Sequence, residues 1–225
     1  MSNKKFILAP SLLACDFSRI GEQLKILEDC GVEYIHLDVM DGMFVPNISF
    51  GQPLIKSIRK KSSLIFDTHL MIKDPLRYID TFVEAGADII TVHVESADNI
   101  KETLEYIRKK GVKASVSIKP KTSPEEIRDL LPLCDMVLCM TVEPGFGGQK
   151  LIHETLDNIR AVKKMRKEAG LDFLIEADGG IGSENVGLVL EAGAEVIVAG
   201  SSVMGKPDIA EAVDLIRNSE VGIRN

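Results

Sequence analysis

The sequence predicts an α/β protein with a (β/α)8 barrel, or TIM-barrel, architecture, and three observations favour this fold. Short apolar runs alternate with amphipathic helical patterns along the chain, and eight of each can be counted. The apolar runs are rich in Ile, Leu and Val with little polar alternation, which is typical of strands buried on both faces of a parallel sheet. The chain has 225 residues, slightly fewer than the ~250 that are typical of such barrels.

The strands are predicted from the apolar runs, and the helices between them from periodicity and end signals. Helix starts are indicated at Asp16, Asp74 and Ser123, the last two followed by proline. Glycines stand where helices should end: Gly31, Gly86, Gly111, Gly170 and Gly193. The Glu-Ala-Gly-Ala-Asp stretch at 84–88 nearly repeats at 191–195, which predicts a recurring helix-to-strand turn. The predicted strands are residues 6–9, 34–39, 64–70, 89–94, 114–118, 136–140, 173–177 and 196–199.

An open, doubly wound sheet is the alternative architecture with the same alternation of strands and helices. Right-handed crossovers build a parallel sheet in either case. No G-x-G-x-x-G follows the first predicted strand, so a dinucleotide site there has no support. Because no linker or low-complexity segment interrupts the pattern, we expect residues 1–225 to form a single barrel domain.

Charge and cysteine content narrow the class of partner and the compartment. The chain has 27 Lys and Arg against 34 Asp and Glu, a net charge of −7, which argues against nucleic acid or an anionic membrane as the main partner. Its cysteines, with no C-x-x-C pair, suit free thiols in a reducing cytoplasm. Lys4 and Lys5 before an apolar stretch that ends at Cys15 resemble a lipoprotein signal. Pro10 interrupts that stretch, so we expect mature protein, and no segment reaches the ~18 apolar residues of a membrane span.

Polar side chains gather at the expected carboxyl ends of the strands, where barrel enzymes carry their chemistry. His36 and Asp38 are two apart and therefore point to the same side of a strand. His69 would approach from the neighbouring strand and Asp178 from across the barrel. A single such residue is more often a hydrogen-bonded core histidine or a capping aspartate, but the four together favour a divalent transition-metal site. His93 could add a fifth, supporting group.

The remaining histidine, His153, falls in a predicted helix and is expected at the surface.

Glycine-rich turns follow the last three predicted strands. They lie at 144–149, at 178–180 and at 200–202, the last just before the final helix. Glycine lets backbone N–H groups approach a phosphate, and a helix amino terminus adds a favourable dipole. Tight turns would also use glycine, but three adjacent turns favour a phosphate site.

Three methionines, Met40, Met71 and Met140, lie at strand ends. Methionine usually fills cores. At these positions the three would form an apolar lining over the metal and the carboxylates.

Taken together, six stretches match one known pattern. They are Ala9-Pro10-Ser11-Leu12-Leu13, His36-Leu37-Asp38-Val39-Met40-Asp41-Gly42 with Phe44-Val45-Pro46-Asn47, Asp67-Thr68-His69-Leu70-Met71, Pro144-Gly145-Phe146-Gly147-Gly148-Gln149, Asp178-Gly179-Gly180-Ile181 and Gly200-Ser201. The chain thereby resembles the ribulose-phosphate 3-epimerase family, in order along nearly its whole length. The resemblance implies a ribulose-phosphate-binding barrel and an isomerase that interconverts ribulose 5-phosphate and xylulose 5-phosphate in the pentose phosphate pathway.

The resemblance also implies roles for individual residues. His36, Asp38, His69 and Asp178 would bind one divalent metal ion, which the residue types leave open as Zn, Fe, Mn or Co. Asp38 and Asp178 would be the acid/base pair, and Met40, Met71 and Met140 the cap. Substrate would be bound by Ser11, His36, His69, Gly145, Phe146, Gly147, Gly148, Asp178, Gly179, Gly180, Gly200 and Ser201. The expected partners are a small phosphorylated sugar and, in a homo-oligomer, further copies of the chain.

The implied mechanism removes the C3 proton on one face of the sugar and returns a proton on the other. Two carboxylates on opposite sides can do this, and a Lewis-acid metal would stabilise the enediolate between the steps. The alternative substrate is a six-carbon ketose 6-phosphate, since related epimerases share most of the site.

Two other functions fit the barrel less well. An aldolase or decarboxylase usually relies on a catalytic lysine. Lys119 is the only lysine near the end of a predicted strand, and no lysine-based catalytic motif surrounds it. A metal-storing or regulatory barrel would be expected to lack a carboxylate or a glycine loop. Lys119-Pro120, Thr141 and Glu143 differ from the forms in many bacterial members and look like those of eukaryotic members, which leaves the source lineage open.

Overall fold

The computed structural model describes residues 6–219, so Lys4 and Lys5 lie outside the described residues. All eight strands pair in parallel in one sheet, in the order β1-β8-β7-β6-β5-β4-β3-β2. A bridge between Ser11 and His36 joins the two end strands, which brings the sheet close to a closed barrel. The strands are β1 Ile7–Pro10, β2 Tyr34–Met40, β3 Ile65–Met71, β4 Ile89–His93, β5 Lys113–Ile118, β6 Met136–Met140, β7 Leu174–Asp178 and β8 Val196–Ala199.

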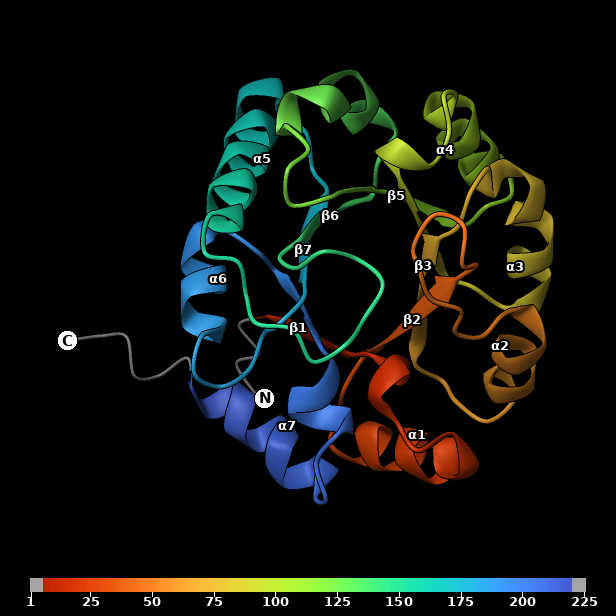
Figure 1. The fold of residues 1–225 in the computed structure, drawn as a ribbon, viewed down its shortest axis with the longest axis vertical. Helices are drawn as coiled ribbons and strands as arrows, with labels where there is room; N and C mark the ends of the chain where they lie inside the picture. The colour runs from red at the N-terminus through yellow and green to blue at the C-terminus, as the bar shows by residue number, and fades with distance from the viewer. Residues whose placement is uncertain (1–5, 220–225) are drawn as a thin grey trace.

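Helices surround the strands in a ring (Figure 1). The α-helices are α1 Ile20–Asp29, α2 Gln52–Arg59, α3 Ile79–Ala85, α4 Ile100–Lys109, α5 Thr155–Ala169, α6 Val186–Ala192 and α7 Ile209–Asn218. Shorter turns of 3-10 helix are η1 Leu12–Ala14, η2 Phe17–Arg19, η3 Pro75–Tyr78 and η4 Val94–Ser96, and a π-helix, η6, spans Gly200–Met204. The (β/α)8 prediction is therefore confirmed.

The helix expected between β5 and β6 differs in kind. The segment Pro124–Leu133 is a 3-10 helix, η5, rather than an α-helix. Pro132 lies inside it and has no N–H to donate, so a regular α-helical ladder cannot run through this segment. The predicted start is correct, because the Ser123 side chain accepts a hydrogen bond from the Glu125 N–H.

The other two predicted helix starts open 3-10 turns that lead into α-helices. The Asp16 side chain caps η2, which precedes α1. Asp74 precedes η3 but makes no side-chain cap, because its backbone is left-handed with φ 49°.

The inner surface of the barrel divides into two zones along its axis. Its amino-terminal part is filled by apolar side chains that include Tyr34, Ile89, Met136 and Val196, each the first residue of its strand. Ala9 and Val198 belong to the same cluster and extend it toward the carboxyl ends of the strands. Side chains alternate in direction along a strand, so Tyr34, His36, Asp38 and Met40 of β2 all face inward. The apolar plug therefore lies below a polar zone that opens at the carboxyl ends of the strands.

The acidic residue at the end of the repeated helix-to-strand turn accepts hydrogen bonds that join neighbouring strands. Asp88 Oδ2 accepts a hydrogen bond from the backbone N–H of Phe66 at 2.7 Å and from Arg59 Nη1 at 2.9 Å. Glu195 Oε2 likewise accepts from the Ile175 N–H at 3.2 Å and from an arginine of α5. Each carboxylate thus ties the start of one strand to its neighbour at the amino-terminal end of the barrel. This confirms the predicted recurring turn.

Two further expectations bear on the chemistry of the chain. The cysteines Cys15, Cys30, Cys134 and Cys139 are all free thiols, as the sequence predicted. Burial raises the pKa of the Cys134 and Cys139 thiols to about 12. No helix within residues 6–219 combines the length and apolar character needed to cross a membrane.

Replacing Asp88 with Ala should lower the free energy of unfolding by about 1–2 kcal/mol, because the partly buried Phe66 N–H and Arg59 lose their acceptor. Urea unfolding followed by circular dichroism measures the change. The control is Asp29→Ala, which removes a surface ion pair with Lys25 and should leave stability nearly unchanged. Equal effects of the two substitutions would contradict the proposed role of the turn.

Candidate active site

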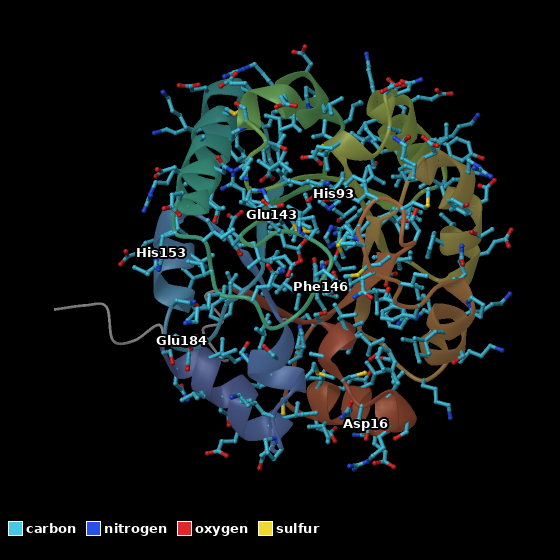
Figure 2. The ribbon with its side chains drawn as sticks, in the orientation of Figure 1. Asp16, His93, Glu143, Phe146, His153 and Glu184 are labelled. Carbon is cyan, nitrogen blue, oxygen red and sulfur yellow. The ribbon has the colours of Figure 1, made fainter. Side chains whose placement is uncertain are left out.

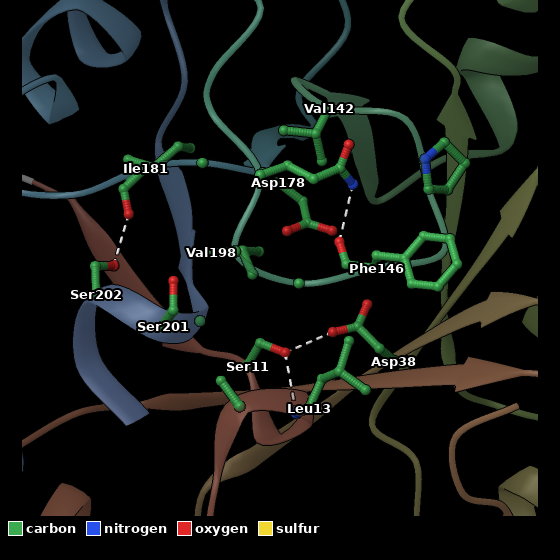
Figure 3. Close-up of a pocket in the computed structure, with 18 of the residues that line it drawn as sticks. Ser11, Leu13, Asp38, Val142, Phe146, Asp178, Ile181, Val198, Ser201 and Ser202 are labelled. Carbon is green, nitrogen blue, oxygen red and sulfur yellow. Dashed lines mark hydrogen bonds between the residues drawn. The ribbon is translucent and has the colours of Figure 1, made fainter. Parts of the chain in front are cut away.

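A cavity of about 750 Å³ opens at the carboxyl ends of the strands. The loops that follow β1, β2, β6, β7 and β8 contribute to its wall. Figure 3 shows Ser11, Asp38 and Asp178 facing the same space. Every sequence-predicted site residue except the two histidines lines it: Ser11, Asp38, Met40, Met71, Met140, Gly145, Phe146, Gly147, Gly148, Asp178, Gly179, Gly180, Gly200 and Ser201.

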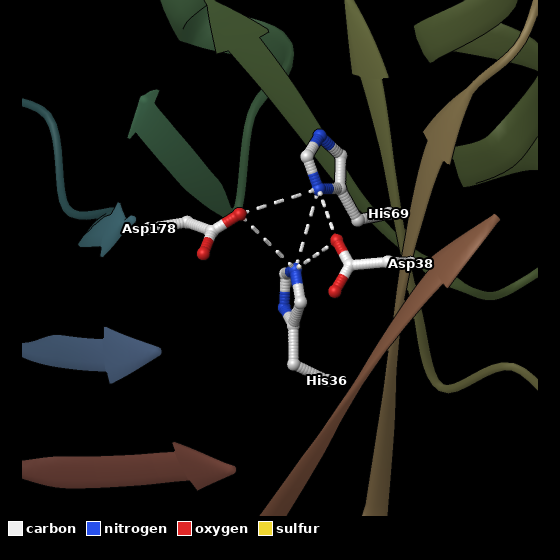
Figure 4. A group of neighbouring side chains, drawn as sticks. All are labelled: His36, Asp38, His69 and Asp178. Atoms are coloured by element: carbon white, nitrogen blue, oxygen red, sulfur yellow. Dashed lines mark hydrogen bonds and ion pairs between the residues drawn. The ribbon is translucent and has the colours of Figure 1, made fainter. Parts of the chain in front are cut away.

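His36, Asp38, His69 and Asp178 form a tight cluster at the floor of this cavity (Figure 4). One nitrogen or oxygen from each lies within 4.8 Å of the others. His36 Nε2 and His69 Nδ1 are 3.3 Å apart, and Asp38 Oδ1 is 3.3 Å from the first and 3.2 Å from the second. Asp178 Oδ2 closes the group at 3.8 and 3.7 Å. The sequence prediction that these four side chains converge is therefore correct.

The donor set fits a divalent transition metal. Two imidazole nitrogens and two carboxylate oxygens converge, and both rings are fully buried. The second nitrogen of each ring is engaged away from the cluster: His36 Nδ1 lies 2.5 Å from Asp67 Oδ2, and His69 Nε2 lies 2.8 Å from His93 Nε2. Such outer partners orient metal-binding imidazoles. The residues present could therefore hold a metal ion.

Asp38 and Asp178 differ in pKa because of burial and of the charges around them. Burial raises the pKa of Asp178 to about 6, and the charge of Asp38 adds to this. Burial acts in the same sense on Asp38, but its contacts with His36 and His69 outweigh it, so the pKa of Asp38 lies well below its usual range. Ser11 Oγ also donates a 2.5 Å hydrogen bond to Asp38 Oδ2. One carboxylate of the pair is thus held ionised while the other accepts a proton more readily.

The pKa of His36 is shifted upward by its neighbours. Burial alone would lower the pKa of His36, but the carboxylates of Asp38 and Asp67 reverse this and raise it well above its usual value.

Two buried carboxyl groups beneath the cluster were missed from the sequence. Asp67 contacts His36, and Glu176 Oε1 lies 3.5 Å from His36 Nδ1. Burial, and then the charge of Asp67, raises the pKa of Glu176 well above its usual value. The signal that could have found them is the strand period, because Asp67 is two residues before His69 and Glu176 is two before Asp178.

The other two histidines occupy different environments. His93 ends β4, is fully buried and stacks on His69 with ring centroids 5.0 Å apart, in keeping with the supporting position predicted for it. Burial lowers the pKa of His93 to about 4. His153 is exposed, as predicted, but it lies in the turn before α5 rather than within a helix (Figure 2). The helix begins at Thr155, two residues after His153.

The long loop after β6 is fastened over one side of the cavity. Asn47 Nδ2 donates to Gly145 O at 2.9 Å, which links this loop to the one after β2. Gln149 Nε2 donates to Glu143 O and Phe146 O, which closes the loop on itself. Phe146 is 55% exposed and lies near the centre of the view in Figure 2, above the barrel.

Comparison with known proteins assigns the chain to a family. The family model described as the ribulose-phosphate 3 epimerase family matches residues 7–204. The chain belongs to this family. It is 47% identical over 220 residues to the ribulose-phosphate 3-epimerase of Synechocystis sp., covering 97% of this chain and 96% of that one. The Bacillus subtilis ribulose-phosphate 3-epimerase is 47% identical, at 95% and 99% coverage.

More distant structures share the fold of this epimerase-family chain. The 3-hexulose-6-phosphate synthase of Salmonella typhimurium superimposes with a TM-score of 0.71 at 20% identity, covering 97% of this chain and all of that one. A tryptophan synthase α-subunit from Pyrococcus furiosus gives 0.70 at 19% identity, with 98% and 99% coverage. The family resemblance stated from the sequence is thus confirmed, and the chain is an isomerase of the carbohydrate epimerase class.

The remaining lining residues complete the site of this epimerase-family chain. Met40 and Met71 pack with Val45 on one side, and Met140 packs on another with its neighbours along β6; all three methionines are almost fully buried. Lys206 is the one basic side chain among the described residues that line the cavity, and the sequence analysis missed it. Its position in the turn just before Pro207, at the expected phosphate end, was the available signal.

Replacing Gly180 with Ala should destabilise the protein and displace the loop after β6. At φ +66° a Cβ on Gly180 would lie 2.4 Å from Leu151 N and 2.7 Å from Lys150 C, both backbone atoms. Gly148→Ala is the matched control, because Gly148 has a similar φ of +74° but open space around it. We expect Gly180→Ala to cost at least about 1 kcal/mol more than the control in urea unfolding. Equal costs would mean that the close approach of these segments is not maintained.

Proposed function

We propose that the chain catalyses the interconversion of D-ribulose 5-phosphate and D-xylulose 5-phosphate by epimerisation at C3, as a step of the pentose phosphate pathway. The observation that carries the proposal is the convergence of His36, Asp38, His69 and Asp178 at the floor of a cavity whose opposite wall is made of glycine turns. The relatives that carry this enzyme's name support it, since they match nearly the whole chain.

A divalent metal would be held by one atom from each of these four side chains. It would supply Lewis-acid stabilisation of the negative charge that develops on the sugar when the C3 proton leaves. Two imidazole nitrogens with two carboxylate oxygens suit Zn, Fe, Mn or Co.

Asp38 and Asp178 would carry out the proton transfers. They come from β2 and β7 and face each other across the cavity floor (Figure 4). Epimerisation needs one group to take the C3 proton from one face of the sugar and another to return a proton to the opposite face. The Ser11 hydroxyl holds Asp38 in place through its Oδ2 atom. The lowered pKa of Asp38 and the raised pKa of Asp178 allow one group to be ionised while the other is protonated.

The phosphate of the substrate would bind between the turns after β7 and β8. Backbone N–H groups at Gly179, Gly180, Gly200 and Ser201 suit an anion because they carry partial positive charge at close approach. Lys206 at the same wall would add one full positive charge. The methionine cap and Phe146 would cover the sugar and exclude water, and closure of the loop around Phe146 would complete the site.

Replacing Asp38 or Asp178 with Asn should reduce turnover by roughly 10²–10⁴-fold, because each substitution removes one proton-transfer group. Coupled assays of ribulose 5-phosphate epimerisation measure the loss, and binding of a phosphorylated sugar by calorimetry should persist. The exposed Asp29→Asn variant is the control and should keep full activity. Near-normal turnover in either site variant would overturn the assignment of the acid/base pair.

Removing metal with a chelator should abolish activity, and adding back Zn, Mn, Co or Fe should restore it to different degrees. In D₂O the reloaded protein should wash deuterium into C3 of the five-carbon substrate. A six-carbon ketose 6-phosphate tested in parallel separates the alternative 3-epimerase activity, which would be the better reading if turnover were faster with that sugar. Full activity of demonstrably metal-free protein would contradict the metal site.

Homo-oligomerisation and a cytoplasmic location remain sequence-based expectations, and light scattering of the purified protein would test the first.

A further inference from the structure

A series of hydrogen-bonded side chains leads from the cluster to the loop after β5. His69 Nδ1 faces Asp38, and the other nitrogen of this ring is directed away from the cluster (Figure 4). That nitrogen, Nε2, lies 2.8 Å from His93 Nε2. His93 Nδ1 lies 3.1 Å from Glu95 Oε2. Both rings are fully buried, so water does not compete for the contact between them.

We propose that Glu95, acting through His93, fixes the ring tautomer of His69 and thereby sets the affinity of the cluster for a divalent cation. Glu95 and His93 are positioning residues in this proposal, because neither lies at the reacting atoms. The inference rests on the proposed metal site and adds to it the residues that prepare one of its ligands.

The number of available protons allows only one donor-to-acceptor order in the hydrogen bonds from His69 through His93 to Glu95. An imidazole that ligates through Nδ1 must carry its proton on Nε2. His69 Nε2 therefore donates, and only one proton can lie between the two facing Nε2 atoms, so His93 Nε2 accepts. The proton of neutral His93 is then on Nδ1, and it is donated to Glu95, whose carboxylate can only accept.

The far end of the chain is held in place by the fold. Glu95 Oε1 accepts hydrogen bonds from the Lys119 N–H at 2.8 Å and from Thr122 Oγ1 at 2.5 Å. Burial would raise the pKa of Glu95, but the donors His93, Thr122 and Lys119 lower it to about 2, so the group is a carboxylate.

The His93 ring is also covered from outside. The Phe44 ring centroid is 4.9 Å from that of His93, and Lys119 Nζ lies 3.9 Å above the Phe44 ring.

His36 is prepared in a different way. Its outer nitrogen contacts the Asp67 carboxylate directly, at 2.5 Å. The outer nitrogen of His69 instead meets a second imidazole, His93, which lies between it and the Glu95 carboxylate. The tautomer of His69 therefore depends on the tautomer of His93 as well. A change at Glu95 should therefore be transmitted to His69 without altering the size of any side chain beside the cluster.

Glu95→Gln is the sharpest test, because glutamine has nearly the same size as glutamate but would donate a hydrogen bond to His93 instead of accepting one. Lys119 and Thr122 both donate, so they retain the carbonyl oxygen of the new amide, and its NH₂ group faces His93. His93 must then accept at Nδ1 and carry its proton on Nε2, where it opposes the Nε2 proton of His69. The favoured relief places the His69 proton on Nδ1, the atom that faces the cluster.

Zn²⁺ affinity should be measured by competition with a chromophoric chelator, without substrate. Glu95→Gln and His93→Phe should each weaken binding by about 10- to 100-fold. His93→Gln should recover much of the loss, because its carbonyl can accept from His69 and its NH₂ can donate to Glu95. Glu195→Gln is the control: it removes charge from a carboxylate that also accepts a backbone N–H, but at the opposite end of the barrel, and it should leave Zn²⁺ affinity unchanged.

Unchanged Zn²⁺ affinity in Glu95→Gln and His93→Phe would overturn the proposal. If the wild-type protein did not bind Zn²⁺ at all, the proposed metal site would be wrong, and so would this inference. The wild-type measurement therefore distinguishes failure of the metal site from failure of the inference alone.

A measurement on the wild-type protein tests the same proposal without any variant, and therefore still applies if the variants do not fold. Long-range ¹H–¹⁵N spectra of the Zn²⁺-loaded protein, labelled at histidine, report which ring nitrogen carries the proton. We expect His69 to be protonated at Nε2 and His93 at Nδ1. A His93 ring protonated at Nε2, or at both nitrogens, would overturn the proposed direction.

Discussion

The burial of charge inside the barrel is the constraint on which the rest of this structure depends. His36 is fully buried and has four carboxyl groups around it: Asp38 beside it, Asp67 and Glu176 beneath it, and Asp178 across the cavity floor. An isolated charge at such depth would be very costly. The carboxylates compensate the imidazole, and the imidazoles compensate the carboxylates. Removing any one of these groups would therefore leave its partners buried without compensation and would change more than its own contacts.

This constraint explains why the barrel interior is divided. The apolar plug at its amino-terminal end supplies packing without polar groups. The strands around it are joined by backbone hydrogen bonds, which do not involve the inner side chains. The polar side chains above the plug are therefore not required for core packing and can serve the active site. The acidic turns at Asp88 and Glu195 lie at the same end as the plug, where they tie strand to strand. Structural and chemical carboxylates are thus kept at opposite ends of the barrel.

The sequence was sufficient for the fold and for the four-residue cluster because both follow from short-range rules. Alternation of apolar runs with helical patterns gave the strands, and the strand period placed His36 beside Asp38. The same period reaches Asp67 and Glu176, which were overlooked rather than unpredictable. Glu95 is different, because it leaves the strand within a 3-10 turn and meets its donors, Lys119 and Thr122, only after the next strand is in place.

The net charge of −7 raises the question of how such a chain would receive a dianionic sugar phosphate. Overall charge acts at long range and is screened beyond about 10 Å at moderate salt, so what matters is the local distribution. On the wall proposed for the phosphate, Lys206 and the backbone amides of the glycine turns would offer positive charge without any basic patch. At the floor, the two carboxylates that would repel a dianion are paired with imidazoles. Under the proposed function, one end of the cavity would bind the permanent negative charge of the phosphate. The other end would stabilise the negative charge that develops on the sugar during proton transfer.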